Sequence, residues 1–147
     1  MSVLEESTKI DKNIISSLIT TGAGYDIMRY QTLPDFLGQD APYLLYLMGK
    51  NMARKTMINN YDELYEFFQY MGWGDLSLIK EKKKVMIFRL TGHIIEKRLS
   101  QDLFNIDYRL ECGFLAETIQ TLTGQTYECL EEKYTKEKYI ELTAMIT

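Results

Sequence analysis

Few residues of this chain are of types that commonly do chemistry, and His93 is the first to consider. It is the only histidine, so any mechanism that uses imidazole as a general base must use it. His93 follows Gly92, and no serine, cysteine or carboxylate motif accompanies it. The pattern favours a polar residue tolerated in a loop, with a catalytic or ligand-binding role as the alternative.

The acidic residues that could act as acids or bases are scattered. They are Asp35, Asp40, Glu111 and Glu117. Asp40 is better explained as a helix cap and Glu117 as a solvated helix position, so no two acids pair for proton transfer. The chain also lacks a glycine-rich phosphate loop, a GxSxG turn and an HExxH motif. We therefore expect no enzyme activity, because no constellation supplies base, nucleophile and oxyanion donors together.

Packing is the simplest explanation for the two cysteines and the single tryptophan. Cys112 and Cys129 match no metal-ligand spacing, so we expect neither a metal site nor another cofactor. Cys112 falls on an apolar helical stripe, where a thiol behaves as a small hydrophobic group, and a pocket-lining thiol is the alternative. Trp73 stands between two glycines, where its indole could anchor a helix to the sheet or form a pocket wall.

Charge and hydropathy argue against two classes of partner. The formal net charge is −4 with a pI near 5.1, and the densest basic cluster, Lys80–Lys84, is typical of a solvated turn. Nucleic-acid binding needs lysine and arginine gathered into a stripe, so we do not expect it. No apolar run approaches the ~20 residues that span a bilayer. Because the acidic start Met1–Glu6 also lacks the apolar core of a signal peptide, we expect a cytoplasmic protein with reduced thiols.

The first half of the chain has helical periodicity. Residues 1–9 are polar and expected to be frayed, and a helix is predicted around Ile14–Ile19. A short helix through Tyr25–Tyr30 should end before Pro34, because the residue preceding a proline avoids the α region.

Two longer helices are predicted next. Asp40 can cap a helix over Ala41–Met52, whose apolar stripe is wide enough to predict burial on more than one side. Asn60 and Glu63 resemble a capping box for a helix that ends at Gly72.

The second half of the chain adds strands. Leu76–Lys80 and the apolar run Val85–Leu90 are predicted strands, whereas Ile94–Leu99 fits either a short strand or a turn of helix. Tyr108–Leu122 carries a clean helical stripe, and residues 126–147 alternate as a closing hairpin. The fold class is therefore α+β, with N-terminal helices and one long helix packed on a roughly four-stranded antiparallel sheet, in a single domain over residues 1–147.

Four motifs occur in a fixed order along the chain. They are Leu33–Asp40, Gly49–Lys55, Gly72–Gly74 and Glu111–Glu117. Together they resemble the YslB-like family, a group of small uncharacterised bacterial proteins found mainly in Gram-positive organisms. The resemblance covers roughly Tyr25 to the C-terminus. The family has no established activity, so the resemblance transfers no catalytic residues.

The helix-and-hairpin ending also resembles a broader superfamily. It joins 4-vinyl-reductase-type sensor domains, TRAPP vesicle-tethering subunits and haem-nitric-oxide-binding domains, whose members commonly dimerise through helices and often hold a small hydrophobic ligand. Sensor-type domains often carry cysteines in the closing strands, and the hairpin Leu130–Tyr139 has none, which argues against zinc. His93 follows a strand rather than lying on a proximal helix, which argues against haem.

These observations leave two functions from different classes. The first is a non-enzymatic cytoplasmic homodimer that acts as a binding or scaffold module through its Met-, Leu- and Tyr-rich helices. The alternative is a sensor-type domain that holds a small hydrophobic ligand between helices and sheet. The candidate pocket residues for this alternative are Trp73, Phe88, Cys112 and Phe114.

Overall fold

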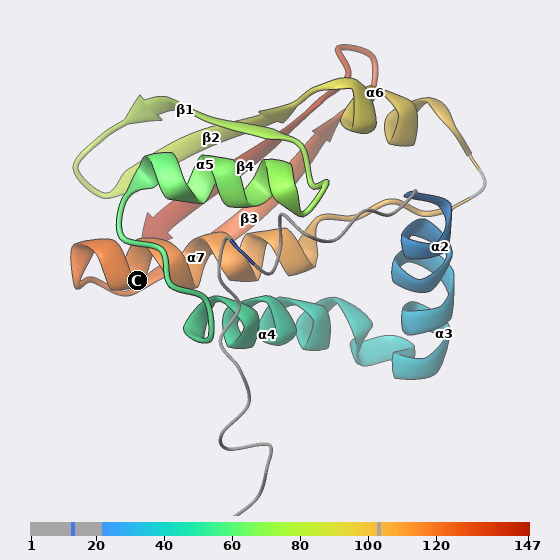
Figure 1. The fold of residues 1–147 in the computed structure, drawn as a ribbon, viewed down its shortest axis with the longest axis horizontal. Coiled ribbons are helices and arrows are strands. Elements are labelled where there is room, and N and C mark those ends of the chain that lie inside the picture. Colours follow the sequence, from blue (N-terminus) through green and yellow to red (C-terminus); the bar gives the residue numbers. More distant parts are fainter. Residues whose placement is uncertain (1–12, 14–21, 103) are drawn as a thin grey trace, which may run out of the picture.

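The computed structural model describes residue 13 and residues 22–102 and 104–147. Figure 1 shows their arrangement, with helices packed against an antiparallel sheet. This confirms the α+β fold class. The predicted fraying of residues 1–9 and the predicted helix around Ile14–Ile19 lie outside the described residues.

The sheet is built from two hairpins that join side by side. Its strands are β1 (Asp75–Glu81), β2 (Val85–Thr91), β3 (Tyr127–Tyr134) and β4 (Tyr139–Ile146). Their order is β1-β2-β4-β3, and every neighbouring pair is antiparallel. The last strand, β4, therefore lies between β2 and β3, and its pairing with β2 joins the two hairpins into one sheet.

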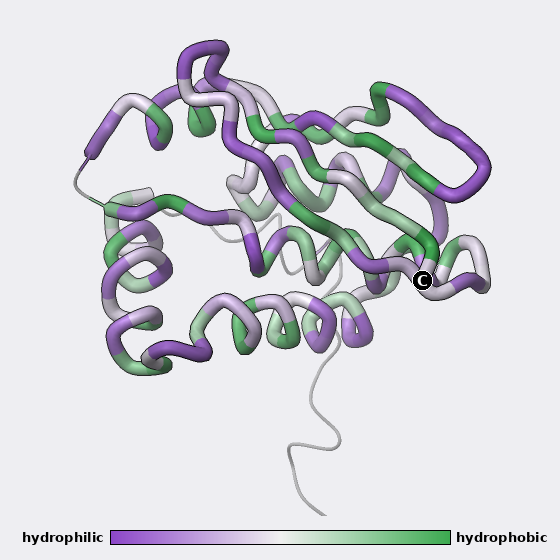
Figure 2. Tube along the Cα trace, turned by 180° about the vertical axis from the view of Figure 1, so that it is seen from behind, coloured by the Kyte–Doolittle hydropathy of each residue, from purple (hydrophilic) through white to green (hydrophobic). Residues whose placement is uncertain are grey.

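Alternation along the central strands gives the sheet one buried face. In β2, Met86, Phe88 and Leu90 are buried while the residues between them are partly exposed. Strand β4 alternates in the same way, because the side chains of successive residues point to opposite faces. The apolar run Val85–Leu90 is therefore buried fully on one face only. Figure 2 looks onto the other face, where the strands lie in front of the helices.

Three helices cover the buried face and one end of the sheet. They are α5 (Tyr61–Tyr70), α6 (His93–Ser100) and α7 (Arg109–Thr123). Asn60 caps α5 as predicted, since its side chain accepts a hydrogen bond of 2.9 Å from Glu63 N. Gly124 ends α7 in the left-handed conformation with φ 77°. The ambiguous segment Ile94–Leu99 belongs to helix α6.

A further helix, α4 (Ala41–Arg54), packs on α7 (Figure 1). The two backbones meet at glycines. A Cβ on Gly49 would collide with the Leu110 carbonyl, and a Cβ on Gly113 would collide with the Tyr46 carbonyl. Only glycine fits at both positions, so the contact fixes how α4 lies along α7.

Helix α4 buries one side, so the prediction of burial on more than one side is wrong. Its buried residues include Leu45 and Tyr46. Tyr43 is 62% exposed and Leu47 39% exposed. Because the apolar stripe is wider than the contact with α7, part of it remains on the surface of the described chain.

The helix before Pro34 does not end there, contrary to the prediction. Helix α2 (Gly22–Ile27) continues through a π-helical stretch, η2 (Met28–Thr32), into α3 (Leu33–Leu37). Pro34 lies in the first turn of α3, where a missing N–H is tolerated. The short helix η3 (Gly38–Asp40) then leads into α4, and Asp40 holds the N-cap position without a side-chain capping bond.

Candidate functional site

The four residues predicted to line a pocket all lie in the packed core. Trp73, Phe88, Cys112 and Phe114 each have 0% exposure. Trp73 meets Phe114 edge-on with ring centroids 5.3 Å apart, and Phe67 stacks on Phe114 at 4.5 Å. These rings fill the space between α5, α7 and the sheet. A ligand pocket lined by these four residues stays a prediction.

Cys112 lies against the second cysteine, Cys129, and both are buried free thiols. Burial and the neighbouring thiol raise the pKa of Cys112 well above its ordinary value. A thiol of raised pKa is poorly reactive, which favours a packing role for Cys112.

The edge of this aromatic core next to α2 and α6 contains an unusual group of buried polar side chains, here called the polar cluster. Its members come from four separate segments of the chain. They are Tyr25, Asp26, Arg29, Tyr30, Trp73, Arg98, Asp107, Tyr108 and Glu111. Helices α2 and η2 contribute the first four, α6 contributes Arg98, and the start of α7 with the residues before it contributes the last three.

The π-helical stretch explains how two neighbouring residues of the polar cluster enter the interior together. Arg29 and Tyr30 lie in η2, and their exposures are 1% and 5%. A π-helical turn is wider than an α-helical turn and is frequently found at functional sites. Here it allows the consecutive side chains of Arg29 and Tyr30 to point inward.

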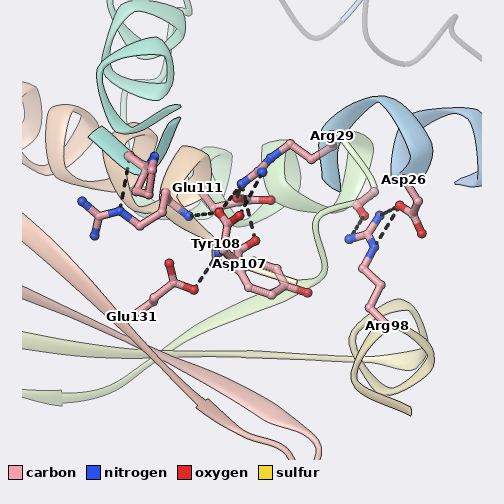
Figure 3. A network of polar contacts seen from close by, with 10 residues as sticks. Asp26, Arg29, Arg98, Asp107, Tyr108, Glu111 and Glu131 are labelled. Atoms are coloured by element: carbon pink, nitrogen blue, oxygen red, sulfur yellow. Dashed lines mark hydrogen bonds and ion pairs between the residues drawn. The ribbon is translucent and has the colours of Figure 1, made fainter. Parts of the chain in front are cut away.

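Two guanidinium–carboxylate pairs hold the polar cluster together (Figure 3). Arg29 Nη2 lies 2.7 Å from an oxygen of Asp107, and its Nη1 lies 3.4 Å from the other. Arg98 pairs with Asp26 through Nη2 at 3.1 Å and Nε at 3.2 Å. These pairs join α2 and η2 to α6 and to the start of α7.

Glu111 is the carboxylate without a guanidinium of its own. It is fully buried, and it pairs with Arg29 Nη2 at 3.5 Å, a nitrogen already bonded to Asp107. Neither Glu111 oxygen has a hydrogen-bond partner among the described residues. Burial raises the pKa of Glu111, and the nearby Arg29 charge opposes that rise. A buried charge without hydrogen bonds is costly, so this position needs a functional explanation.

Other polar atoms of the polar cluster are also buried without hydrogen-bond partners in the described chain. They are Arg29 Nε, Trp73 Nε1 and the hydroxyls of Tyr25, Tyr30 and Tyr108. Burial raises the pKa of Tyr25, and the nearby Trp73 indole opposes that rise, although the two groups make no hydrogen bond of ordinary geometry. Because most buried polar groups in proteins are satisfied, a concentration of exceptions in one place marks a candidate binding site.

Two hollows lie beside this region. One has a volume of about 300 Å³ and is lined by residues of α2, α6 and the turn after α5, including Tyr25 and Arg98. The other has a volume of about 440 Å³ and includes Ile27, Ile94 and Phe104 in its wall. Arg98 borders both hollows and belongs to the polar cluster. The polar cluster is thus adjacent to surface depressions with both polar and apolar walls.

A further acid lies at the margin of the polar cluster. Glu131 of β3 accepts a hydrogen bond of 2.6 Å from the backbone N–H of Tyr108. Burial first, and then the negative charge of Asp107, raise the pKa of Glu131 to about 7. This carboxyl group therefore titrates near neutral pH.

The remaining acids and the histidine from the sequence lie elsewhere. His93 is exposed at the first position of α6, and Asp35 and Asp40 are exposed. Glu117 is not the solvated residue that the pattern predicted: it is 9% exposed and pairs with Arg54 Nε of α4 at 3.2 Å. The α4–α7 contact covers this side of α7, which a stripe counted on one helix cannot indicate.

Sequence reasoning missed the polar cluster, although one signal was present. Every residue from Leu110 to Ile119 is buried, so α7 is covered on all sides. A charged residue such as Glu111 inside a helix of this kind must face either a partner or a functional site. The described residues contain no group of three histidines, cysteines or acids that could hold a metal ion. Within them, no helix has the length and hydrophobicity required to cross a bilayer.

Comparison with known proteins defines the class. Residues 22–145 match the model of a family described as a protein of unknown function, DUF2507, and the chain belongs to that family. A curated relative is the uncharacterized protein YslB of Bacillus subtilis (strain 168), which is 37% identical over 119 residues, 81% of this chain and 80% of YslB. The resemblance to the YslB-like family is confirmed.

Solved structures with the same fold include two of interest. One is a vinyl-4-reductase family protein from Methanocaldococcus jannaschii, with a TM-score of 0.66 and 15% identity over 92% of this chain and 87% of that one. The other is the phenol-responsive sensory domain of the transcription activator PoxR with phenol, with a TM-score of 0.60 and 14% identity over 88% and 76%. At these identities the likeness establishes the fold alone, which agrees with the broader superfamily.

Proposed function

We propose that this protein is a non-enzymatic binding module that holds a small molecule at the polar cluster. The observation that carries the proposal is the group of buried polar atoms without partners around Glu111. Leaving a buried donor or acceptor unpaired costs about 1–3 kcal/mol. A bound molecule that supplies the missing hydrogen bonds would recover this free energy, which gives the site a reason to persist.

The surroundings suit a ligand with a polar group and a small apolar body. The hydroxyls of Tyr25, Tyr30 and Tyr108 supply polar contacts, and the adjacent hollow supplies apolar walls such as Ile94. Small-molecule sites commonly combine apolar walls with a few convergent polar groups. The PoxR sensory domain, a fold neighbour, has been determined with phenol, which supports a ligand-binding role here by analogy of fold.

Native mass spectrometry of gently purified protein tests this proposal. We expect a reproducible adduct of a few hundred daltons that is lost on denaturation. Tyr30→Phe, which keeps the ring and removes the hydroxyl, should reduce the adduct. Tyr65→Phe on α5 is the matched control and should retain it. A wild-type protein that carries no adduct after purification and gains none from a bacterial metabolite extract would overturn the proposal.

A homodimeric scaffold is the second candidate, and exposed apolar residues favour it. Phe36 of α3 is 87% exposed, and Tyr43 and Leu47 of α4 are exposed nearby in the chain. Exposed apolar groups of this kind are typical of contact surfaces. Light scattering should find a dimer that Leu47→Glu converts to a monomer, while Glu66→Gln on α5 should leave it intact. A monomeric wild-type protein at micromolar concentration would contradict this function.

A further inference from the structure

Glu111 has no guanidinium group of its own in the polar cluster. Arg29 is committed to Asp107 through two nitrogens, and Arg98 is committed to Asp26. Each guanidinium therefore has its own carboxylate. Glu111 remains as a further carboxylate in the interior, with only the 3.5 Å contact to the shared Arg29 nitrogen. An ionised Glu111 would need a further cation beside it, and without one burial keeps the pKa of this carboxyl group raised.

Three tyrosine hydroxyls surround Glu111 together with the Arg29 guanidinium. The pKa values of Tyr25, Tyr30 and Tyr108 are all raised, first by burial and next by the Glu111 charge, which places the three hydroxyls in the field of this carboxylate. Tyr25 and Tyr30 meet edge-on, with ring centroids 6.5 Å apart. Carboxylate and hydroxyl oxygens attract a cation. The faces of the Tyr25 and Tyr30 rings already meet the guanidinium groups of Arg98 and Arg29.

We infer that the polar cluster binds a small organic ammonium ion, with its nitrogen at Glu111 and the tyrosine hydroxyls and its apolar part toward the hollow between α2 and α6. This inference rests on the proposed function. An ammonium group has several N–H donors and no acceptor, which matches two unpartnered carboxylate oxygens. It also supplies the missing charge.

The alternatives fit less well. A neutral alcohol has one O–H donor, so it would leave a Glu111 oxygen unpaired and the charge uncompensated. A carboxylate ligand would be repelled by Glu111 and would have to displace Asp26 or Asp107 from its guanidinium. The charge balance therefore selects a cation.

Three probes of equal chain length test this inference, namely hexylammonium, hexan-1-ol and hexanoate. Trp73 is the only tryptophan, and its unpartnered indole N–H belongs to the polar cluster. Its single indole signal in ¹H–¹⁵N NMR spectra therefore reports binding at this place. In the wild-type protein, we expect hexylammonium to shift this signal and to bind at least about tenfold more tightly than either other probe, as charge-assisted hydrogen bonds allow.

A matched pair of variants sharpens the test. Glu111→Gln keeps the shape and removes the charge, so it should abolish the preference for hexylammonium over hexan-1-ol. Glu117→Gln, on the same helix but paired with Arg54, should preserve it. The comparison of probes on the wild-type protein requires no variant, so it holds even if Glu111→Gln folds poorly.

The outcomes separate this inference from the proposed function. Equal or tighter binding of hexan-1-ol or hexanoate at Trp73 would overturn the inference of a cation and support ligand binding. No response to hexylammonium at millimolar concentration would also overturn it, and the native mass spectrum would then judge ligand binding by itself.

Discussion

Helix α7 carries two buried glutamates whose surroundings differ. Glu117 lies on the side covered by α4 and pairs with Arg54, a residue whose side chain is 61% exposed. Glu111 lies two turns earlier, fully buried, with both oxygens lacking hydrogen bonds in the described chain. At Glu117, the partner Arg54 explains the buried carboxylate. At Glu111, the fold tolerates a buried acid without hydrogen bonds, and departures of this kind are expected at functional sites.

The packing of α4 on α7 accounts for the partner at Glu117. The close approach of the two backbones at Gly49 and Gly113 brings the C-terminal end of α4, with Arg54, beside Glu117. Glu111 instead faces η2, where Arg29 already has a carboxylate of its own. The difference between the glutamates therefore comes from which face of α7 each one occupies.

The largest expected effect comes from breaking the α4–α7 contact. Gly113→Ala places a Cβ against the Tyr46 carbonyl and 3.2 Å from Lys50 N, and backbone atoms cannot move aside as a side chain can. We expect a loss of about 3 kcal/mol or more in the free energy of unfolding, at the upper end for an overpacked site. Urea unfolding measures it. Gly24→Ala in α2, whose Cβ meets nothing within 4 Å, is the control and should cost nothing.

The next largest effect is the pH dependence of the free energy of unfolding that Glu131, at the margin of the polar cluster, should cause. Its pKa is raised from 4.5 to about 7, so between these values the folded protein keeps a proton that the unfolded chain has lost. Stability therefore falls as pH rises through this range, and is restored below it, by at most about 3 kcal/mol. Glu131→Gln should remove this part of the pH dependence. Parallel stability profiles of variant and wild type from pH 4 to 8 would contradict the assignment.

A smaller effect is expected on the α4 side of α7, where the buried polar groups have hydrogen-bond partners. The Tyr46 hydroxyl of α4 donates to Glu128 and accepts a hydrogen bond of 3.0 Å from Cys129 N at the edge of β3. Tyr46→Phe leaves that N–H unpaired, and we expect a cost of about 2 kcal/mol. Amide hydrogen exchange at Cys129 should become faster. Tyr43→Phe, on the exposed side of the same helix, should change neither quantity; an equal loss there would refute the role given to the Tyr46 hydroxyl.

The sequence predicts local features of this protein, but it does not predict contacts between residues that lie far apart in the chain. The stripe of α7, the cap at Asn60 and the alternation of β4 are local patterns, and all three elements were predicted. The partners Arg29 and Asp107 lie 78 positions apart, and no spacing rule joins them. The polar cluster becomes visible only when the fold brings its four segments together.

The predicted pocket failed to locate the polar cluster for a related reason. Aromatic residues such as Phe88 and Phe114 are equally suited to a core and to a pocket wall, and the structure places both in the core. Trp73 is the one predicted residue that also belongs to the polar cluster, through its indole N–H. The width of the apolar stripe on α4 likewise could not indicate how much of it α7 covers.

The most direct test of the account compares the free energies of unfolding of wild type, Glu111→Gln and Glu117→Gln, by urea titration of ligand-free protein at pH 7.5. Because burial raises the pKa of Glu111, folding at pH 7.5 either buries its charge or takes up a proton, so Glu111→Gln should stabilise the protein by about 1 kcal/mol. Glu117→Gln should cost up to about 1 kcal/mol, the value of a pair open to solvent. Marked destabilisation by Glu111→Gln, with Glu117→Gln unchanged, would mean that Glu111 is already satisfied within the fold and would contradict the central claim.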